Sequence, residues 1–438
     1  METLGIVMFA ALLFGLLIGY PVAFTLGGVS LIFGIFTFGF EFFTLLPMRM
    51  WNRMTNFTLV AVPLFIFMGV LLERSGIAEE LLETMALLFR RLRGGLAVSV
   101  VIVGALLAAT TGIIAATVVT MGLISLPVML RWGYKPGLAT GTIAAAGTLC
   151  QIIPPSIALV ILGDIMQVSV GELFAGAFLP GVLLALSYIV YIIIYAFVRP
   201  SVAPCLPEEE LGSINPKALA LRVVKALLPP FFLILAVLGS IFFGIASPTE
   251  SAGVGAVGAI ILTLVRKRMS LDVLKQVMVS TTRLCSMAFM ILLGAAAFGL
   301  VFRGLGGDSV VKNFLLGTIG GRWGILAVVM FTLFFLGCFL DFIEITFIVI
   351  PLLAPIMKEL GFNPLWFSIL VGVNFQNSFL TPPFGFALFF LRGVAPPQVT
   401  TGQIYRGVVP FILIQIVGLI LLIIFPQLVT WLPNIIFQ

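Results

Sequence analysis

Two short stretches, GTLCQIIPPS at residues 147–156 and LTPPF at residues 380–384, place a pair of prolines inside otherwise apolar segments. Proline has no backbone N–H, and its ring clashes with the carbonyl group four residues earlier. Each pair therefore predicts a helix that breaks near its middle and frees backbone carbonyl groups. Within a membrane, such carbonyls are tolerated where other protein groups or a bound ion satisfy them.

The composition predicts that both breaks lie within lipid. Of the 438 residues, 61% are hydrophobic and 9% are charged, and the mean hydropathy is +1.26. A transmembrane helix needs roughly 20 apolar residues, and about ten or eleven such segments fit along the chain. The apolar run that ends at Phe38 is compatible with one crossing or two. No A-x-A-like cleavage site follows the first segment, so we expect a retained helix.

Several classes of function are excluded or disfavoured. The chain has no histidine, which removes imidazole metal sites and histidine-dependent catalysis. Its net charge of +6 comes from basic residues in short loops, as the positive-inside rule predicts, so we expect no nucleic acid partner. A channel would require a continuous polar pore, and a membrane enzyme would have only one candidate carboxylate pair. The four cysteines are too scattered to predict disulfides or a thiolate metal site: Cys150, Cys205, Cys285 and Cys338.

An internal repeat relates the two halves of the chain. Residues 126–137 (LPVMLRWGYKPG) align with residues 354–365 (APIMKELGFNPL). The alignment also superposes four prolines of the first half on four of the second. These are Pro127, Pro136, Pro154 and Pro155, which fall on Pro355, Pro364, Pro382 and Pro383. Such repeats mark the two halves of many transporter folds.

The repeat is predicted to be inverted. In each half, an apolar segment with a polar interruption precedes the broken helix, at residues 94–131 and 323–357, and we interpret both as re-entrant hairpins. Five full crossings then separate the equivalent loops: residues 137–163, 173–198, 226–245, 249–265 and 284–302. Because five is odd, the halves face opposite sides. With the first hairpin opening to the cytoplasm, 17 of the 23 basic residues lie on that side, as insertion energetics favour.

The polar groups at the two centres are the candidate ligands. Hydroxyl groups near the breaks are suitable oxygens for a cation: Thr110, Thr111, Thr148, Ser156, Ser378 and Thr381. Asp341 and Glu344, in the second hairpin, are predicted to bind a cation, to carry a proton or to contact the substrate. The alternatives are pairing with an arginine such as Arg303, or a place at the hairpin mouth. Asn374 and Asn377 contact either the substrate or a neighbouring helix, and we expect Asp164 and Glu172 to be solvated.

At this point the residues match a known family. The chain resembles, over nearly its whole length, the large membrane subunit (DctM-like) of tripartite ATP-independent periplasmic (TRAP) transporters. Three motifs carry the resemblance: ATTGIIAAT at residues 109–117, GTLCQIIPPS at residues 147–156 and TPPFGF at residues 381–386. The Asp341 and Glu344 pair is less typical of the family, and it argues against assuming a simple C4-dicarboxylate substrate.

The resemblance implies an all-α, multi-pass protein of the bacterial inner membrane, with an elevator-type fold of the ion-transporter superfamily. It implies Na⁺ as the coupling ion, no other cofactor, and an organic acid as the usual substrate. The implied partners are a separate small four-helix membrane subunit, a periplasmic substrate-binding protein and membrane lipid. A stand-alone Na⁺- or H⁺-coupled carboxylate carrier of similar fold is the alternative, and complex formation distinguishes the two.

The implied sodium sites pair each hairpin tip with the adjacent helix break. Carried over by position, they comprise Thr110, Thr111, Gly112, Cys150, Ile153, Pro154, Gly337, Thr381 and Pro382. The candidate substrate-binding residues are Ser156, Asp341, Glu344, Asn374 and Asn377.

The expected domain division follows the repeats. Residues 1–93 are N-terminal scaffold helices ending in an interfacial arm, residues 77–93. Residues 94–198 are the first repeat core, with its hairpin, the broken helix 137–163 and a following helix. A cytoplasmic linker, residues 199–225, leads to scaffold helices at residues 226–302, which include a second arm at residues 270–279. Residues 323–438 form the second repeat core, with the broken helix 365–391 and a C-terminal helix.

Overall fold

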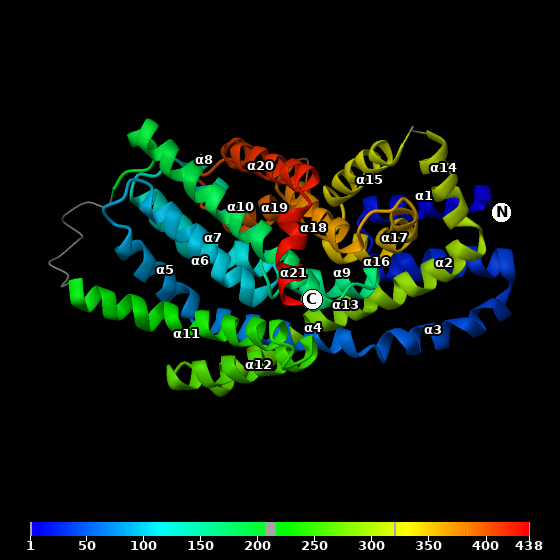
Figure 1. Cartoon of the computed structure of the whole chain (residues 1–438), viewed down its shortest axis with the longest axis horizontal. Helices are drawn as coiled ribbons and strands as arrows, with labels where there is room; N and C mark the ends of the chain where they lie inside the picture. The colour runs from blue at the N-terminus through cyan, green and yellow to red at the C-terminus, as the bar shows by residue number, and fades with distance from the viewer. Residues whose placement is uncertain (1, 206–215, 319–320, 383, 438) are drawn as a thin grey trace.

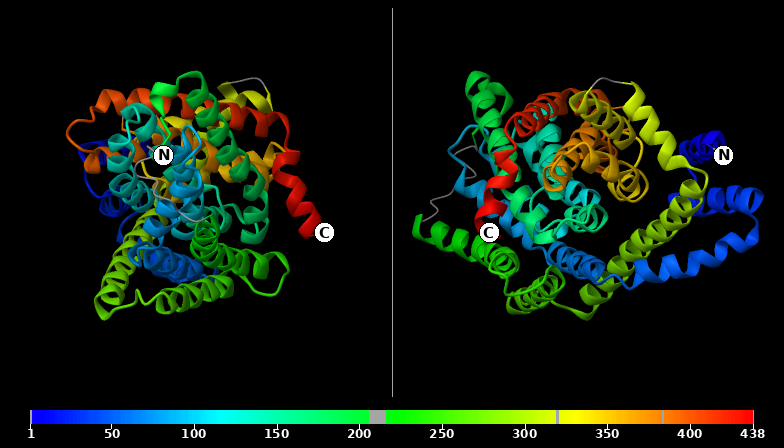
Figure 2. Two further views of the ribbon diagram at one scale, coloured as in Figure 1. Left: turned by 90° about the vertical axis from the view of Figure 1, so that its left-hand side faces the viewer. Right: turned by 45° about the vertical axis from the view of Figure 1, so that its right-hand side comes forward.

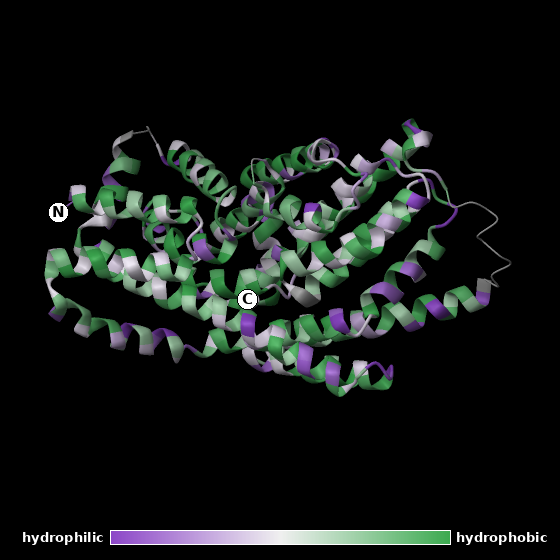
Figure 3. Ribbon diagram, turned by 180° about the vertical axis from the view of Figure 1, so that it is seen from behind, coloured by the Kyte–Doolittle hydropathy of each residue, from purple (hydrophilic) through white to green (hydrophobic). Residues whose placement is uncertain are grey.

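The computed structural model describes residues 2–205, 216–318, 321–382 and 384–437, without the side chains of Thr110, Thr111, Pro216 and Thr318. Within these ranges the regular structure is entirely helical, which confirms the predicted class. Seven of the described helices are long and apolar enough to cross a membrane, and five shorter ones are also apolar. Figure 3 shows hydrophobic residues over most helix surfaces, as lipid-facing helices require.

Described residues 2–205 form ten α-helices with short 3₁₀ turns between them. They are α1 (Glu2–Ile18), α2 (Val22–Phe38), η1 (Phe40–Thr44), α3 (Leu45–Met54), η2 (Phe57–Val60), α4 (Ala61–Arg74), α5 (Ile77–Leu88), α6 (Gly95–Thr111), α7 (Ile114–Arg131), α8 (Pro136–Thr148), η3 (Leu149–Gln151), α9 (Ile157–Met166), α10 (Val170–Val198) and η4 (Pro200–Val202). The apolar run that ends at Phe38 is therefore two helices, which turn at residues 19–21.

The second half repeats this order. Its helices are α11 (Pro216–Phe242), α12 (Pro248–Val265), α13 (Leu271–Gly304), α14 (Gly307–Thr318), α15 (Arg322–Gly337), α16 (Phe342–Ile348), α17 (Ile350–Glu359), α18 (Pro364–Leu380), α19 (Phe386–Val394), α20 (Thr401–Ile424) and α21 (Gln427–Ile436).

Helix contacts extend the inverted repeat to the N-terminal helices. Helix α4 of the first half packs against α12 of the second half, and the equivalent helices α13 and α2 pack against each other in the same way. Likewise α5 packs against α11, and its equivalent α14 packs against α1. The two units are therefore α1–α10 and α11–α20. In Figure 1 the hairpin α6–α7 enters from the left and the hairpin α15–α17 from the right, with their ends meeting near the centre. Figure 2 shows α4, α11, α12 and α13 along one side, below the hairpins and broken helices.

Small residues hold the first broken helix against the long helix beside it. Helix α8 crosses α20 at a glycine contact, where a Cβ on Gly407 would lie 2.0 Å from the carbonyl oxygen of Gly137. A Cβ on Gly141 would lie 2.2 Å from the carbonyl oxygen of Gly407. Every residue of α8 from Leu138 to Thr148 is buried. Because lipid provides little hydrophobic drive for helix association, close backbone approach of this kind stabilises the bundle through van der Waals contact.

Two boundaries differ from the sequence predictions. The second arm is not a separate element at residues 270–279, because that stretch is the first part of the continuous helix α13, and the counterpart of α5 is α14. Residues 216–225 of the expected linker are the first turns of α11, whose helix-forming leucines and alanines outweigh its charges. Residues 206–215 of the linker lie outside the described residues.

Asp164 is not solvated, contrary to expectation. It follows the apolar part of α9, yet only 10% of its side chain is exposed. Its carboxylate accepts a hydrogen bond from Asn56 and lies 3.5 Å from the guanidinium of Arg53. Both partners belong to the segment around α3, which the sequence pattern did not place beside α9.

Candidate functional site

The first helix break is closed largely by its own hydrogen bonds. Helix α8 tightens into η3, and α9 restarts at Ile157 after the proline pair. The hydroxyl of Ser156 donates to the carbonyl oxygen of Gln151 at 3.0 Å, and the N–H of Ile153 donates to the carbonyl of Leu149 at 2.9 Å. The carbonyl of Gln151, which the proline pair was expected to free, is therefore satisfied by the hydroxyl of Ser156. Cys150 and Ser156 are fully buried within this break.

The tip of the first hairpin touches the far side of the same break. Gly112 ends α6 with a φ of +60°, a left-handed conformation that glycine adopts without strain. A Cβ at this position would lie 3.1 Å from the backbone nitrogen of Ile157. The tip is thus pressed against the N-terminus of α9. The backbones of Thr110 and Thr111 belong to α6, while their side chains lie outside the described residues.

The tip of the second hairpin carries the two carboxylates. Asp341 is the N-cap of α16, and Glu344 completes a capping box by accepting a hydrogen bond from the Asp341 N–H at 3.1 Å. Arg303, the pairing partner considered from the sequence, instead lies 3.6 Å from Asp308. Among the described residues, no basic side chain forms an ion pair with Asp341 or Glu344, so two acidic groups stand without a counter-ion in the middle of an apolar bundle.

The second break is packed directly against the end of α15. A Cβ on Gly337 would lie 2.2 Å from the hydroxyl oxygen of Ser378, so only glycine fits there. The hydroxyl of Thr381 donates to the carbonyl oxygen of Asn377 at 2.7 Å, and that of Ser378 donates to the carbonyl of Phe375 at 2.8 Å. Each hydroxyl uses its hydrogen for a helix carbonyl, and its oxygen lone pairs remain available to a cation.

Both hairpin tips and both breaks border one cavity of about 280 Å³ at the centre of the molecule. Its polar walls come from Gln151, Asp341 and Glu344, and the remaining walls are the two hairpin tips and apolar side chains of α4, α9, α13 and α19. The cavity meets the N-termini of α9 and α19 at Ile157 and Phe386. Helix N-termini attract negative charge, while the carboxylates attract positive charge. The cavity can therefore hold a cation together with a solute that has an acidic group.

Unsatisfied amide groups lie beside the breaks. Both polar side-chain atoms of Gln376, together with the side-chain carbonyl oxygens of Gln151 and Asn377, are buried without a hydrogen-bond partner among the described residues. Buried amides normally have partners, and exceptions call for an explanation such as an ion or water. Asn374 differs, because its amide donates to the carbonyl of Met330 in α15 at 2.7 Å, which is interhelical packing.

Comparison with known proteins places the chain in a family. Residues 6–428 match the sequence model described as "Tripartite ATP-independent periplasmic transporter, DctM component". The chain belongs to the DctM family. Members of this family are multi-pass proteins of the bacterial inner membrane, which the apolar helices of this chain fit. The resemblance seen in the three sequence motifs is thereby confirmed.

Relatives of this DctM-family chain are named as transporter permeases for different solutes. The chain is 31% identical to the C4-dicarboxylate TRAP transporter large permease protein DctM of Pseudomonas aeruginosa, covering 89% of each chain. It is 32% identical to the ectoine/5-hydroxyectoine TRAP transporter large permease protein UehC of Ruegeria pomeroyi, covering 87% of each. The Alcanivorax borkumensis YdaH transporter has the same fold, with a TM-score of 0.63, 16% identity and coverage of 94% of this chain and 98% of that chain.

Sequence reasoning missed several residues that border the central cavity. Val62 and Ile66 of α4 and Met287, Ala288 and Ile291 of α13 carry no chemical signal, because they are ordinary apolar residues of long helices. Gln151, within the first proline motif, is a further cavity residue outside the predicted ligand set. Its signal was an amide side chain in an otherwise apolar segment, three residues before the proline pair.

Proposed function

We propose that this DctM-family chain is the translocating subunit of a sodium-coupled, binding-protein-dependent secondary transporter that imports an organic acid or related small polar solute by an elevator mechanism. Its partners would be a small four-helix membrane subunit and a periplasmic substrate-binding protein. The relatives named as C4-dicarboxylate, ectoine and sialic acid TRAP permeases support transport of small polar solutes. They do not specify the solute of this chain.

The observation that carries the proposal is the central cavity. Two carboxylates, an amide and two helix N-termini meet there, beside walls that are mostly apolar. Ionisable groups in a membrane interior are costly, and they mark ion and substrate pathways. A cation near Asp341 and Glu344 would supply part of the missing counter-charge, so an acidic solute would meet less repulsion from the two carboxylates once the cation is bound. Cation and solute binding would thereby be coupled.

The sodium sites would use oxygens at each hairpin tip and break. Sodium is a hard cation that prefers oxygen ligands, and the hydroxyl oxygens and backbone carbonyls near Thr381 and Cys150 are of this kind. The buried amide oxygens of Gln151 and Asn377, which have no partner among the described residues, are further candidates. We place one site between Gly112 and the first break, and the other between Gly337 and the second break.

Thr381→Ala is expected to weaken sodium binding roughly tenfold, because a neutral hydrogen-bonding oxygen contributes about 1 kcal/mol and a charged contact more. The measurement is thermal stability of the purified protein in detergent, titrated with NaCl against KCl at constant ionic strength. Thr381→Ser keeps the hydroxyl and is expected to retain the sodium response. Equal sodium midpoints for the alanine variant and the wild type would contradict the site at the second break.

The elevator mechanism would move the hairpins and broken helices along α4 and α13. The surfaces that meet at the central cavity are mostly apolar, which suits sliding, and several polar contacts between described residues cross between the two groups of helices. One is the hydrogen bond from Thr120 of α7 to Glu73 of α4, at 2.7 Å. Another joins Lys312 of α14 to Glu359 of α17, at 2.7 Å.

The Glu73 and Thr120 contact offers a test of the movement. Cysteines at these two positions, in a background without the native cysteines, are expected to crosslink on oxidation and to stop uptake, with recovery after reduction. A matched pair within the scaffold, at Ser240 of α11 and Ser251 of α12, whose hydroxyl oxygens lie 2.8 Å apart, is expected to crosslink without inhibition. Full uptake by the crosslinked Glu73 and Thr120 pair would exclude sliding at this contact.

Transport itself is tested by reconstitution. The chain, its small membrane subunit and its binding protein are incorporated in liposomes, and uptake of a panel of radiolabelled organic acids is followed with an inward sodium gradient. We expect uptake of at least one acid, abolished when potassium replaces sodium and when the binding protein is omitted. Sodium-driven uptake by the chain alone would instead identify a stand-alone carrier. Uptake driven equally by a proton gradient would contradict sodium coupling.

A further inference from the structure

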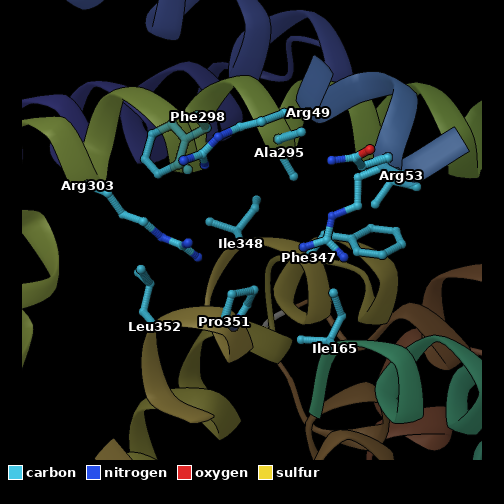
Figure 4. A pocket seen from close by; sticks show the side chains of 14 residues that line it. Arg49, Arg53, Ile165, Ala295, Phe298, Arg303, Phe347, Ile348, Pro351 and Leu352 are labelled. Carbon is cyan, nitrogen blue, oxygen red and sulfur yellow. The ribbon is translucent and has the colours of Figure 1, made fainter. Parts of the chain in front are cut away.

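A second cavity, distinct from the central one, is lined by three arginines. It has a volume of about 240 Å³ and lies between α3 and α13 on one side and α9, α16 and α17 on the other. Arg49 and Arg53 project from α3 and Arg303 from α13, and Figure 4 shows their guanidinium groups directed into the space above Phe347, Ile348 and Pro351 of the second hairpin.

The charge of these arginines is only partly balanced. Arg53 lies 3.5 Å from Asp164, and Arg303 lies 3.6 Å from Asp308. Among the described residues no carboxylate forms an ion pair with Arg49. Partial burial, together with the positive charges of Arg303 and Arg53, lowers the pKa of Arg49. The three guanidinium groups therefore repel one another, and an anion placed among them would relieve this repulsion.

The arginine cavity continues into a larger, polar one. This neighbouring cavity has a volume of about 660 Å³ and shares Arg53 and Arg303 with the first. It adds Lys358 as a further cation and Glu172 as an anion. The route from this larger space to the apolar wall formed by the second hairpin is therefore lined predominantly by positive charge.

One face of α13 borders both the arginine cavity and the central cavity. Leu284, Met287, Ala288 and Ile291 face the central cavity, and Leu292, Ala295, Phe298 and Arg303 face the arginine cavity. Most of these residues are three or four positions apart, as one helix face requires. Ala288 and Phe298 are separated by roughly 15 Å along the helix axis. A hairpin that slides along α13 would carry the central site toward the arginines.

We infer that Arg49, Arg53 and Arg303 form an outer anion site, which holds the acidic group of the solute before it enters the central cavity. The inference rests on the proposed function, and it adds the chemical requirement for a carboxylate or an equivalent small anion. Arginine suits this role because its planar guanidinium donates two parallel hydrogen bonds to a carboxylate.

A small solute fits the cavity better than a lipid headgroup. The walls of the cavity come from two groups of helices, and Phe347, Ile348 and Pro351 close the cavity below the arginines. The volume suits a molecule of a few carbon atoms with one or two acidic groups. A phospholipid would have to pass its acyl chains between α3 and the second hairpin. Occupation by lipid is therefore an outcome that the experiment must exclude.

The experiment measures how fast phenylglyoxal modifies each arginine, by peptide mass spectrometry on the full chain in detergent. Potassium is the only cation, so that sodium-coupled binding does not contribute, and potassium succinate is compared with KCl at equal ionic strength. At a succinate concentration ten times its dissociation constant, modification of Arg49 and Arg303 is expected to slow roughly tenfold. Arg283, an exposed arginine on the same helix as Arg303, is the internal control.

Three outcomes would overturn the outer anion site. They are no protection by succinate, equal protection of Arg283, and protection by phosphatidylglycerol micelles without protection by succinate. Variants provide a second measurement: Arg49→Gln and Arg303→Gln are expected to raise the succinate concentration for half-maximal thermal stabilisation about tenfold, and Arg283→Gln is expected to leave it unchanged. Sodium-driven uptake is measured separately. If sodium-driven uptake were absent while succinate still protected Arg49 and Arg303, the result would count against the proposed function and support the anion site.

Discussion

Replacing Gly407 with alanine is expected to reduce the free energy of unfolding by about 3 kcal/mol, the upper range for overpacking a filled core. The added Cβ would lie 2.0 Å from the carbonyl oxygen of Gly137 and 2.7 Å from its carbonyl carbon. Both are backbone atoms, which cannot rotate away as a flexible side chain can. Helices α8 and α20 must therefore separate, and the tightest helix crossing around the broken helices loses its close contact. Thermal unfolding of the purified protein in detergent measures the effect.

Gly402 provides the matched control for this prediction. It lies in the first turn of the same helix, and a Cβ there would meet no atom within 4 Å. Gly402→Ala is expected to leave stability unchanged or to raise it slightly, because alanine loses less backbone entropy in a helix. If the two alanine variants melted at the same temperature, close approach of α8 and α20 would not be a source of stability in this bundle.

The helical framework was predictable because its causes are local. A proline pair is a local signal for a helix break, although Pro229 and Pro230 lie inside the continuous helix α11, and apolar segments of sufficient length cross lipid without further information. The inverted arrangement followed from an odd number of crossings and the bias of basic residues. The full extent of the repeat was not predictable, since α1 and α2 correspond to α11 and α12 through their contacts and not through shared residues. The arm at α14 was missed for the same reason.

The candidate site was predictable in outline, and its hydrogen bonds were not. Carboxylates and hydroxyls near helix breaks stand out in an apolar sequence, so Asp341, Glu344 and Thr381 could be named in advance. The partner of each group depends on rotamers and on neighbouring helices. Asn374 contacts Met330 in a separate helix, and Arg303 pairs with Asp308 a turn away. Pairings of this kind require the three-dimensional arrangement.

The arginine cavity shows how separate segments create a property that none has alone. Arg49 and Arg53 belong to a short amphipathic helix, where a structural biologist would expect basic residues at the membrane surface. Arg303 lies at the end of a long apolar helix, where a terminal arginine is also ordinary. Their convergence on one space opposite the second hairpin becomes visible only when α3 is placed beside α13 (Figure 4).

Asp341→Asn and Glu344→Gln are each expected to reduce sodium-driven uptake roughly 100-fold, because truncating a buried charged contact costs several kcal/mol. Both substitutions remove charge while preserving local structure. Asparagine is as good an N-cap as aspartate, and glutamine can replace glutamate at the third position of a capping box. The α16 cap that these two residues form is therefore retained. Uptake and thermal stability are measured on the same preparations, so that loss of function is separated from loss of fold.

Asp272→Asn is the matched control, because Asp272 also lies in the first turn of a helix, α13, but is exposed and remote from the central cavity. It is expected to retain uptake. If Asp341→Asn retained uptake as well, the capping box would be the whole role of that carboxylate. The charge argument would then apply to Glu344 alone, whose carboxylate accepts a hydrogen bond from the Asp341 N–H. Loss of uptake with an unchanged melting temperature in both variants would assign the pair to cation or solute binding, because the cap remains intact and only the negative charge is missing.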